Sequence, residues 1–327
     1  MKQWAKHSGF TIVELLIVIV VIAILAAITI VAYTGIQDRA KVSAVSSELS
    51  GAARKIASEK AGSTTEQYPT SLSAAGVLAQ GDVTFSYYVN NVSIPSSFCL
   101  TGVQGSYEYH VTSTNTAPSE GTCEVTNGLK GWWKLNGNAN DSSGNGYNGT
   151  IVNATSTTGM FGQANTAYNF GSNRRINIPT GSVVVGNGSY SISVWFQAGS
   201  FCSCGLIGWG GWGTNNQATA LRFDTVSGGG MRLYWWYTDM FRADTNLADN
   251  KWHNVVATWD GTSRVMYIDG AEVGRDSPAA HAAVASTAYI GMTNTAEYWG
   301  GKLDDVRIYS RAISNVEVGT IYAAGAQ

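Results

Sequence analysis

The first sixty residues are organised around one long apolar run. Residues 8–28 are almost entirely apolar and contain a single carboxylate, Glu14. The nineteen residues at 15–33 are uncharged, which is long enough for a helix that spans a bilayer. Charged residues then alternate with small and apolar ones, and no proline occurs before Pro69. This pattern predicts one helix from residue 10 to about 60, whose second half is the spine of a small globular domain.

After this helix, the pattern changes to short alternating segments separated by Gly-, Ser- and Asn-rich turns. Residues 83–89 and 107–112 predict strands, so the first part combines a long helix with a short antiparallel sheet in an α+β domain. Residues 124–128 look like a short linker. Beyond it helical patterns disappear and ten of the eleven tryptophans occur, which indicates an all-β sandwich. Its candidate strands are 129–135, 175–178, 190–197, 220–224, 231–237, 252–259, 264–268, 288–290 and 303–309.

Glu14 is the residue of the apolar run that is unfavourable inside a membrane. A carboxylate inside a membrane-spanning helix costs roughly 2.5 to 3.5 kcal/mol on insertion scales, so a partner cation is implied. The polar leader at 1–9 carries Lys2 and Lys6, which should stay on the cytoplasmic side. A secretory signal peptide has a shorter apolar region, of roughly 7 to 15 residues. The run therefore predicts a membrane-inserted helix that contains a charge pair.

The segment SGFTIVELLIVIVVIAILAAI at 8–28 resembles the prepilin leader of type IV pilins and their pseudopilin relatives. The resemblance implies that a prepilin peptidase in the membrane cuts between Gly9 and Phe10 and methylates the new amino group of Phe10. It also implies that Glu14 pairs with the N-terminal amine of a neighbouring subunit during filament assembly. Cleavage creates an α-amino group in the same apolar layer, which supplies the cation that a buried carboxylate needs.

The second part resembles the laminin-G-like, concanavalin A-like jelly roll. The resemblance rests on LKGWWKLNGNANDSSGNGYNGT at 129–150, SISVWF at 191–196, NKWHNVVATWDGTSRVMYIDGAEVG at 250–274 and GGKLDDVRIYSRAISNVEV at 300–318. The expected organisation is a leader at 1–9, a pilin domain at 10–127 and a jelly-roll domain at 128–327. This superfamily includes lectins, carbohydrate-binding modules, protein-binding domains and spacers, so the fold alone does not specify a ligand.

Composition and cysteine content agree with an exported protein. The net charge is −2 and only 13% of residues are charged, which is typical of β-rich extracellular modules and not of nucleic-acid-binding proteins. The pilin-like leader implies export into an oxidising space, so Cys99, Cys123, Cys202 and Cys204 are expected to form disulfides. A bridge between Cys99 and Cys123 closes a loop of about 25 residues, worth on the order of 3 kcal/mol in the chain-entropy model. A bridge between Cys202 and Cys204 would be tight.

One loop suggests a cation site. Oxygen-bearing side chains occupy its first, third and fifth positions, Asp141, Ser143 and Asn145, and a glycine occupies the sixth. Val152 stands where an EF-hand has its final glutamate, so the loop is not an EF-hand. In laminin-G-like jelly rolls a calcium ion often joins an early loop to the last strand, which implies Asp304 as a second carboxylate. Alternatively, Asp141 and Asn145 only shape a turn. Structural calcium is the only cofactor that the sequence suggests.

The tryptophans divide into strand and loop positions. Those in strands are expected in the core, and in each of the pairs 132/133 and 235/236 one ring should point inward and the other outward. Glycine-flanked aromatics in loops suit stacking on the apolar face of a sugar ring. The candidate ligand contacts are Trp209, Trp212, Tyr298 and Trp299, with Asn215, Asn216 and Gln217 available for hydroxyl groups. The alternative is a satellite hydrophobic cluster under the loops.

No catalytic motif accompanies the predicted jelly roll. Retaining glycoside hydrolysis needs two carboxylates about 5 to 5.5 Å apart. The glutamates after residue 128, Glu272, Glu297 and Glu317, each stand alone in the sequence, the last in a C-terminal turn. There is also no nucleophile elbow and no Walker loop. The sequence therefore predicts a protein that is not an enzyme.

Together these features predict a subunit of a type IV pilus-like filament that displays a lectin-like domain for adhesion, with a glycan as its ligand. Expected partners are other pilin subunits, the prepilin peptidase, the membrane around the N-terminal helix, and an extracellular glycan or surface protein. Nucleic acid is not expected at this net charge. The chain would lie in the inner (cytoplasmic) membrane before assembly and in an extracellular surface pilus afterwards. Two alternatives remain: a structural or protein-binding pilin, and a pseudopilin of a secretion or DNA-uptake machine.

Overall fold

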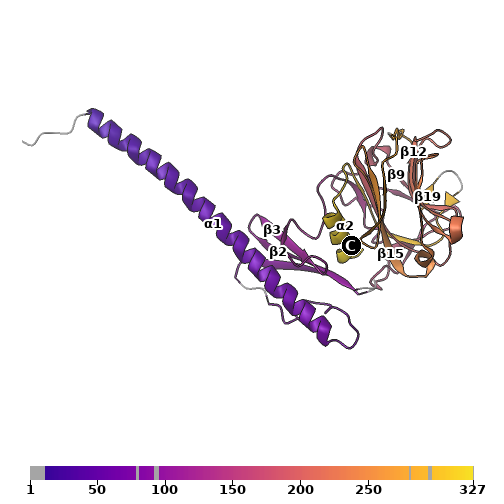
Figure 1. Cartoon of the computed structure of the whole chain (residues 1–327), viewed down its shortest axis with the longest axis horizontal. Coiled ribbons are helices and arrows are strands. Elements are labelled where there is room, and N and C mark those ends of the chain that lie inside the picture. The colour runs from indigo at the N-terminus through magenta and orange to yellow at the C-terminus, as the bar shows by residue number, and fades with distance from the viewer. Residues whose placement is uncertain (1–11, 79–80, 92–95, 280, 294–296, 327) are drawn as a thin grey trace, which may run out of the picture.

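The computed structural model describes residues 12–78, 81–91, 96–279, 281–293 and 297–326. A long helix, α1 (Ile12–Gly62), projects from a small sheet, and a β-sandwich lies on the other side of that sheet (Figure 1). The helix agrees with the one predicted from residue 10 to about 60. Its first half is exposed and apolar, and by length and composition it is able to cross a membrane. Glu14 lies in its first turn, whereas the processing residues Gly9 and Phe10 lie outside the described residues.

The small sheet is antiparallel, with the strand order β1–β2–β3–β4. Its strands are β1 (Thr84–Asn90), β2 (Ser97–Gln104), β3 (Tyr107–Thr112) and β4 (Ser119–Glu120). The second half of α1 packs on one face through Val45, Leu49 and Ile56, which are fully buried. Leu49 lies against Gly102 of β2, where a Cβ atom would come within 3.0 Å of its side chain. Glycine at this position therefore lets the helix approach the sheet closely.

The sandwich consists of two sheets, which we call the covered sheet and the open sheet. The covered sheet has the order β17 (Ala271–Asp276), β16 (Arg264–Ile268), β15 (Trp252–Trp259), β10 (Tyr190–Gln197), β21 (Lys302–Tyr309), β8 (Ala167–Asn169), β7 (Thr155–Thr157), and β5 (Leu129–Trp133) pairs with β21. The open sheet has the order β14 (Met240–Ala243), β13 (Gly230–Tyr234), β12 (Ala218–Asp224), β11 (Cys204–Gly210), β18 (Ala288–Ile290), β9 (Arg175–Ile178), β6 (Thr150–Val152), with β19 (Met292–Thr293) and β20 (Glu297–Tyr298) beside β11.

The main core lies between these two sheets. In β10 the side chains alternate, so that Ile192, Val194 and Phe196 face this core while Trp195 belongs to a separate cluster on the outer side. The strands predicted at 190–197 and 252–259 have the bounds of β10 and β15. The predicted fold, an α+β part followed by a concanavalin A-like sandwich, is therefore confirmed.

A second helix, α2 (Asn315–Ala324), follows β21 and corrects the prediction that helical patterns end at residue 128. Ser314 starts it with a capping box, in which the Ser314 hydroxyl accepts from the Glu317 amide and the Glu317 carboxylate accepts from the Ser314 amide. Glu317, expected in a turn, is thus in the first turn of a helix. In Figure 1 α2 lies between the small sheet and the sandwich.

Candidate functional site

Two of the predicted ligand contacts, Trp209 and Trp299, are fully buried, and the prediction is wrong for both. Trp209 belongs to β11, and its Nε1 donates to the carbonyl of Val184 at 3.0 Å. Trp299 packs edge-on against Phe196 and Phe223 inside the main core. Neither indole is available to a ligand, because both fill the space between the two sheets.

The other predicted tryptophan, Trp212, lies in the loop after β11 and remains half-buried. Its ring stacks on Tyr234, with 5.9 Å between ring centroids, and Tyr234 meets Trp236 edge-on at 5.8 Å. Tyr237 follows and is 80% exposed. We call Trp212, Tyr234, Trp236 and Tyr237 the aromatic cluster. It lies at the ends of β11 and β13, and Tyr234, which follows the core residue Leu233, faces away from the core.

Only Trp212 of this cluster was among the predicted contacts. The sequence did contain a signal for a second member, because two consecutive tryptophans in the strand predicted at 231–237 should point in opposite directions, although β13 itself ends at Tyr234. Trp235 is indeed fully buried and Trp236 is half-buried. The pair 132/133 behaves differently, since Trp132 and Trp133 are both buried. Trp132, the outward member of this pair, is covered by the Arg307 guanidinium and donates to Asp305.

The backbone of the cluster is strained. Trp236 and Tyr237 have φ angles of 59° and 91°, in the left-handed region that bulky side chains rarely adopt. Such a conformation costs on the order of 1 to 3 kcal/mol and persists only where surrounding contacts impose it. Here the Asn216 amide donates to the Trp236 carbonyl at 3.0 Å, and the Thr238 hydroxyl donates to the Asn216 side chain. Strain of this kind gathers at ligand-binding and catalytic sites, so we take this turn as the centre of the candidate site.

Polar side chains lie beside the rings. The Arg222 guanidinium is 5.1 Å from the Tyr234 ring centroid, and its Nη2 is 3.1 Å from Oε1 of Glu297. The Thr293 hydroxyl donates to the other oxygen of Glu297 at 2.9 Å. Arg222 is 7% exposed, while the Glu297 side chain is 29% exposed. The carboxylate is therefore held in place and still reaches solvent.

The remaining predicted contacts lie near this group. Asn215 is exposed in the loop that carries Trp212, and Tyr298 is half-buried next to Glu297 in β20. Aromatic faces bind the apolar side of a sugar ring, whereas amide and carboxylate groups bind its hydroxyls. The open sheet thus presents aromatic rings together with amide and carboxylate groups on its outer side.

The predicted calcium loop is built as a turn. Oδ1 of Asp141 accepts from the amides of Trp132 and Ser143, and Oδ2 accepts from the Tyr147 amide and the Ser143 hydroxyl, at 2.8 to 3.0 Å. Burial alone would raise the pKa of Asp141, but these hydrogen bonds hold it below its ordinary value. The Nδ2 atom of Asn145 donates to the Leu129 and Lys130 carbonyls. The oxygens of Asp141 are thus already engaged, and this loop fits a cation poorly.

Asp304 lies elsewhere, beside a cavity of about 240 Å³ whose lining includes Asn136, Gln163 and Thr166. Its side chain is almost completely buried, and this burial, with the neighbouring Asp305, raises the pKa of Asp304 well above its ordinary value. One carboxylate with amide and hydroxyl oxygens matches the oxygen ligands that Ca²⁺ prefers. Within the described ranges no group of three or more His, Cys, Asp or Glu side chains gathers. Asp304 accepts hydrogen bonds from the backbone at Asp305 and Met160, fewer than Asp141 accepts, so it is the carboxylate to test as a calcium ligand.

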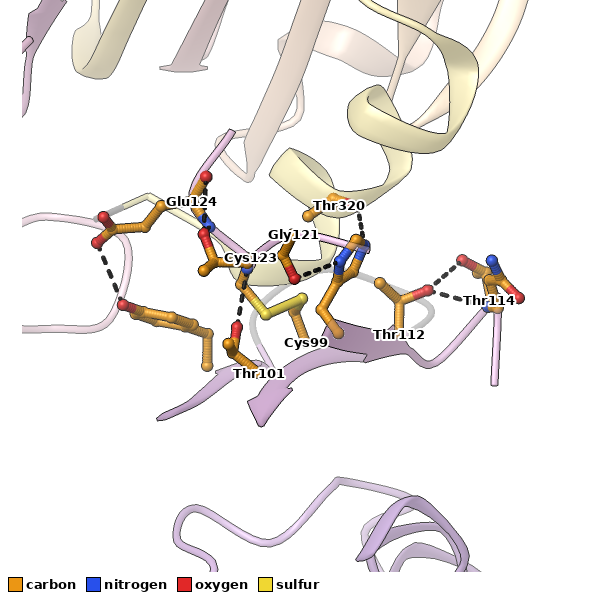
Figure 2. Close-up of a disulfide and its surroundings, with 12 residues drawn as sticks. Cys99, Thr101, Thr112, Thr114, Gly121, Cys123, Glu124 and Thr320 are labelled. Atoms are coloured by element: carbon orange, nitrogen blue, oxygen red, sulfur yellow. Dashed lines mark hydrogen bonds between the residues drawn. A yellow bond between two sulfur atoms is a disulfide. The ribbon is translucent and has the colours of Figure 1, made fainter. Parts of the chain in front are cut away.

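The cysteines are paired in the structure as the sequence suggested. Cys99 and Cys123 are joined with 5.9 Å between their Cα atoms, and Cys202 is joined to Cys204. Figure 2 shows the first disulfide lying between the small sheet and α2, close to Thr320. Both of its cysteines are fully buried.

Two family models match the chain. The model described as the prokaryotic N-terminal methylation motif matches residues 4–30, and the model described as the concanavalin A-like lectin/glucanases superfamily matches residues 170–319. The chain joins a prepilin-type motif to a concanavalin A-like domain. In this prepilin-type chain the motif covers the start of α1, and the domain match covers most of the sandwich, including the aromatic cluster.

Several solved structures are similar to part of the chain. The binding domain of Paraclostridial Mosquitocidal Protein 1 has a TM-score of 0.49 at 15% identity, covering 61% of this chain and 52% of that one. Domain 4 of AbnA, a GH43 extracellular arabinanase from Geobacillus stearothermophilus, in complex with arabinotriose, has a TM-score of 0.47 at 18% identity, covering 58% and 96%. The receptor binding domain of botulinum neurotoxin C/D mosaic serotype gives 0.46 and 16%, covering 61% and 51%. The prepilin-type chain thus spans about half the length of the first and third of these. No curated protein matches it.

Proposed function

We propose that the chain is a subunit of a type IV pilus-like filament that carries its concanavalin A-like domain on the outer surface. The methylation motif and the exposed apolar first half of α1 support insertion into a membrane before assembly. In this proposal the prepilin peptidase processes the bond between Gly9 and Phe10, and Glu14 pairs with the amine of a neighbouring subunit. The assembled filament is extracellular, where both cysteine pairs remain oxidised.

The domain binds a glycan through the aromatic cluster, and the observation that supports this best is the left-handed turn at Trp236 and Tyr237. A strained turn that exposes a tyrosine ring costs stability, so a function is needed to explain it. The rings of Trp212 and Tyr237 offer stacking surfaces, and Glu297 and Asn215 offer hydrogen bonds to hydroxyl groups. A filament displays many copies, so weak individual contacts add through avidity.

In this proposal the glutamates of the sandwich serve binding and not hydrolysis. The three glutamates after residue 128 are each paired with an arginine: Glu272 with Arg275, Glu297 with Arg222, and Glu317 with Arg311. A general acid in glycoside hydrolysis needs a raised pKa. The arginine partners instead hold the pKa of Glu272 below its ordinary value, and that of Glu317 below it against the effect of burial.

Glycan-array binding of the full chain in detergent micelles tests this function, with Trp212→Ala as the key variant. We expect the substitution to reduce binding by tenfold or more, because it removes a stacking surface of the cluster. Phe161→Ala is the matched control, since Phe161 is also an exposed aromatic, at 37%, but lines the Asp304 cavity. Equal loss in both variants, or no glycan binding by the wild type, contradicts the proposal and favours a protein ligand, for which aromatic and arginine side chains are also common contacts.

A further inference from the structure

Helix α2 is buried on both of its long sides. Towards the sandwich, Val318 and Ile321 pack into a cluster with Val256, Tyr267 and Tyr309. In the same direction Tyr322 stacks on Trp195, with ring centroids 5.8 Å apart and an angle of 11° between the planes. From Val318 onward α2 is mostly apolar and buried, so this part is stable only where other elements cover it. The sandwich covers one side of α2.

The small sheet covers the other side. Ala323 and Ala324 pack against the disulfide between Cys99 and Cys123, in the region drawn in Figure 2. The hydroxyl of Thr320 lies 3.2 Å from Nε2 of His110 in β3. The small sheet thus has α1 on one face and α2 on the other, although α2 comes after the whole sandwich in the sequence.

The connection between β4 and β5 is also fixed, which differs from the short linker expected at 124–128. The Tyr309 hydroxyl donates to the Val125 carbonyl at 2.9 Å, and Nε of Arg311 donates to the Asn127 carbonyl at 2.8 Å. The amide of Ser310 donates to the Gly128 carbonyl at 2.8 Å. The chain therefore enters the sandwich and leaves it side by side, and these two segments are bonded to each other.

We propose that the sandwich is an insertion within the pilin module, and that α2 and the segment 121–128 form a rigid joint between the two. Two modules joined by one free linker would move independently. Here any rotation has to separate α2 from the disulfide or from Trp195 and would expose apolar surface that is now buried. The joint fixes the direction in which the aromatic cluster points relative to α1, whichever ligand the cluster binds.

Hydrogen exchange of the full chain in detergent micelles, followed by mass spectrometry, tests the joint. In the wild type we expect the amides of α2 to exchange as slowly as those of β2. The same holds for the amides of Gly121, Cys123 and Ser310, which donate to Glu108, Thr101 and Gly128. Ala324→Glu places a carboxylate against the disulfide and should accelerate exchange at all these amides by tenfold or more, with β10 and β15 unchanged. Val316→Glu is the matched control, because Val316 is on the same helix but 46% exposed, and it should leave the pattern unchanged.

Two results with the first set of proteins would overturn the proposal. The first is wild-type exchange in α2 and at Gly121, Cys123 and Ser310 that is as fast as in exposed loops. The second is Ala324→Glu with the wild-type pattern. If Ala324→Glu does not fold, Thr320→Val replaces it, since this variant keeps the shape of the side chain and removes the contact with His110. We expect Thr320→Val to accelerate exchange in α2 by about twofold to fivefold, and an unchanged rate there would also reject the joint.

Discussion

The two outer faces of the sandwich carry the same kinds of side chain, but these side chains differ in how far they are buried. On the covered sheet, Arg307 lies 4.3 Å from the Trp132 ring centroid and is paired with Asp305, and all three side chains are buried. On the open sheet, Arg222 lies near Tyr234 and is paired with Glu297, whose side chain reaches solvent. The arginine, the ring and the carboxylate are arranged alike on both faces. The difference is that α2 packs on the first face, whereas Glu297 on the second face reaches solvent.

This comparison separates structural aromatics from those available for recognition. The covered face shows that rings and arginines on an outer sheet surface become fully buried when a partner packs on them. On the open face Arg222 is buried as well, but Tyr234 and Glu297 remain half-buried, so part of this face is accessible to solvent. Accessible aromatic groups of this kind are typical of binding surfaces.

The largest change in unfolding free energy should come from a substitution on the covered face. Trp195→Ala removes a fully buried ring that stacks on Tyr322, and such truncations cost about 3 to 5 kcal/mol of unfolding free energy. Trp212→Ala on the open face should change it by less than about 1 kcal/mol. Urea unfolding of the full chain and both variants measures the contrast. Equal destabilisation would mean that the open face is as structural as the covered one.

Calcium should act on the covered sheet through Asp304. At a hundredfold excess over the dissociation constant, calcium adds about 2.7 kcal/mol of stability, which corresponds to a rise in melting temperature of roughly 5 °C or more. We expect Asp304→Asn to abolish this rise, whereas Asp141→Asn should keep it, because the oxygens of Asp141 are already hydrogen-bonded. Thermal unfolding with calcium and with chelator gives the answer. If only Asp141→Asn lost the calcium-dependent rise in melting temperature, the calcium site would be the loop at 141–145 and not the Asp304 cavity.

On the open face, Tyr237→Gly should change stability and glycan binding in opposite directions. Glycine adopts a φ of 91° without strain, so the variant should be more stable by up to about 1 kcal/mol. It should also bind glycans at least tenfold more weakly, since the exposed ring is lost. Tyr237→Phe keeps the ring and should bind normally. If Tyr237→Gly were less stable than the wild type and bound glycans equally well, the left-handed turn would not be a cost that binding explains.

The smallest effect concerns His253, at the start of β15. Burial alone would lower its pKa, but hydrogen bonds and charges from Asp269 and Asp249 raise it above its ordinary value, and Lys251 also pairs with Asp249. A raised pKa stabilises the folded state below about pH 6.5, and this contribution, less than about 1 kcal/mol, is lost as the pH rises through the folded pKa. His253→Gln should therefore flatten stability between about pH 6 and 8. An unchanged slope would contradict this assignment.

Regular strands were predictable from the sequence because their hydrophobic alternation is local. The errors arose where distant segments decide the environment. The glycines around Trp209 indicate a loop, yet a Cβ atom on Gly208 would lie 2.8 Å from the Thr293 side chain. Glycine is present there because the Thr293 side chain, from a distant segment, packs against the strand, not because the chain turns. The sequence of β11 gives no information about that segment, so the burial of Trp209 could not be predicted.

Two further features had only partial signals. The capping box at Ser314 and Glu317 is a recognisable helix start, but α2 lacks the polar face that marks a surface helix, because it is covered on both sides. Trp236 was recognisable as an outward ring from the pairing of two tryptophans. Its left-handed backbone was not, since positive φ is expected at glycine or asparagine and not at an aromatic residue.

The position of α2 also determines the order of events during biogenesis. His110 and Thr320 are 210 residues apart, so the small sheet receives its second cover only after the entire sandwich has been synthesised. Contacts of such long sequence separation form slowly. Until α2 arrives, Cys99 and Cys123 remain accessible to oxidants, and afterwards both are fully buried. We therefore expect the disulfide between Cys99 and Cys123 to form before α2 docks on the small sheet.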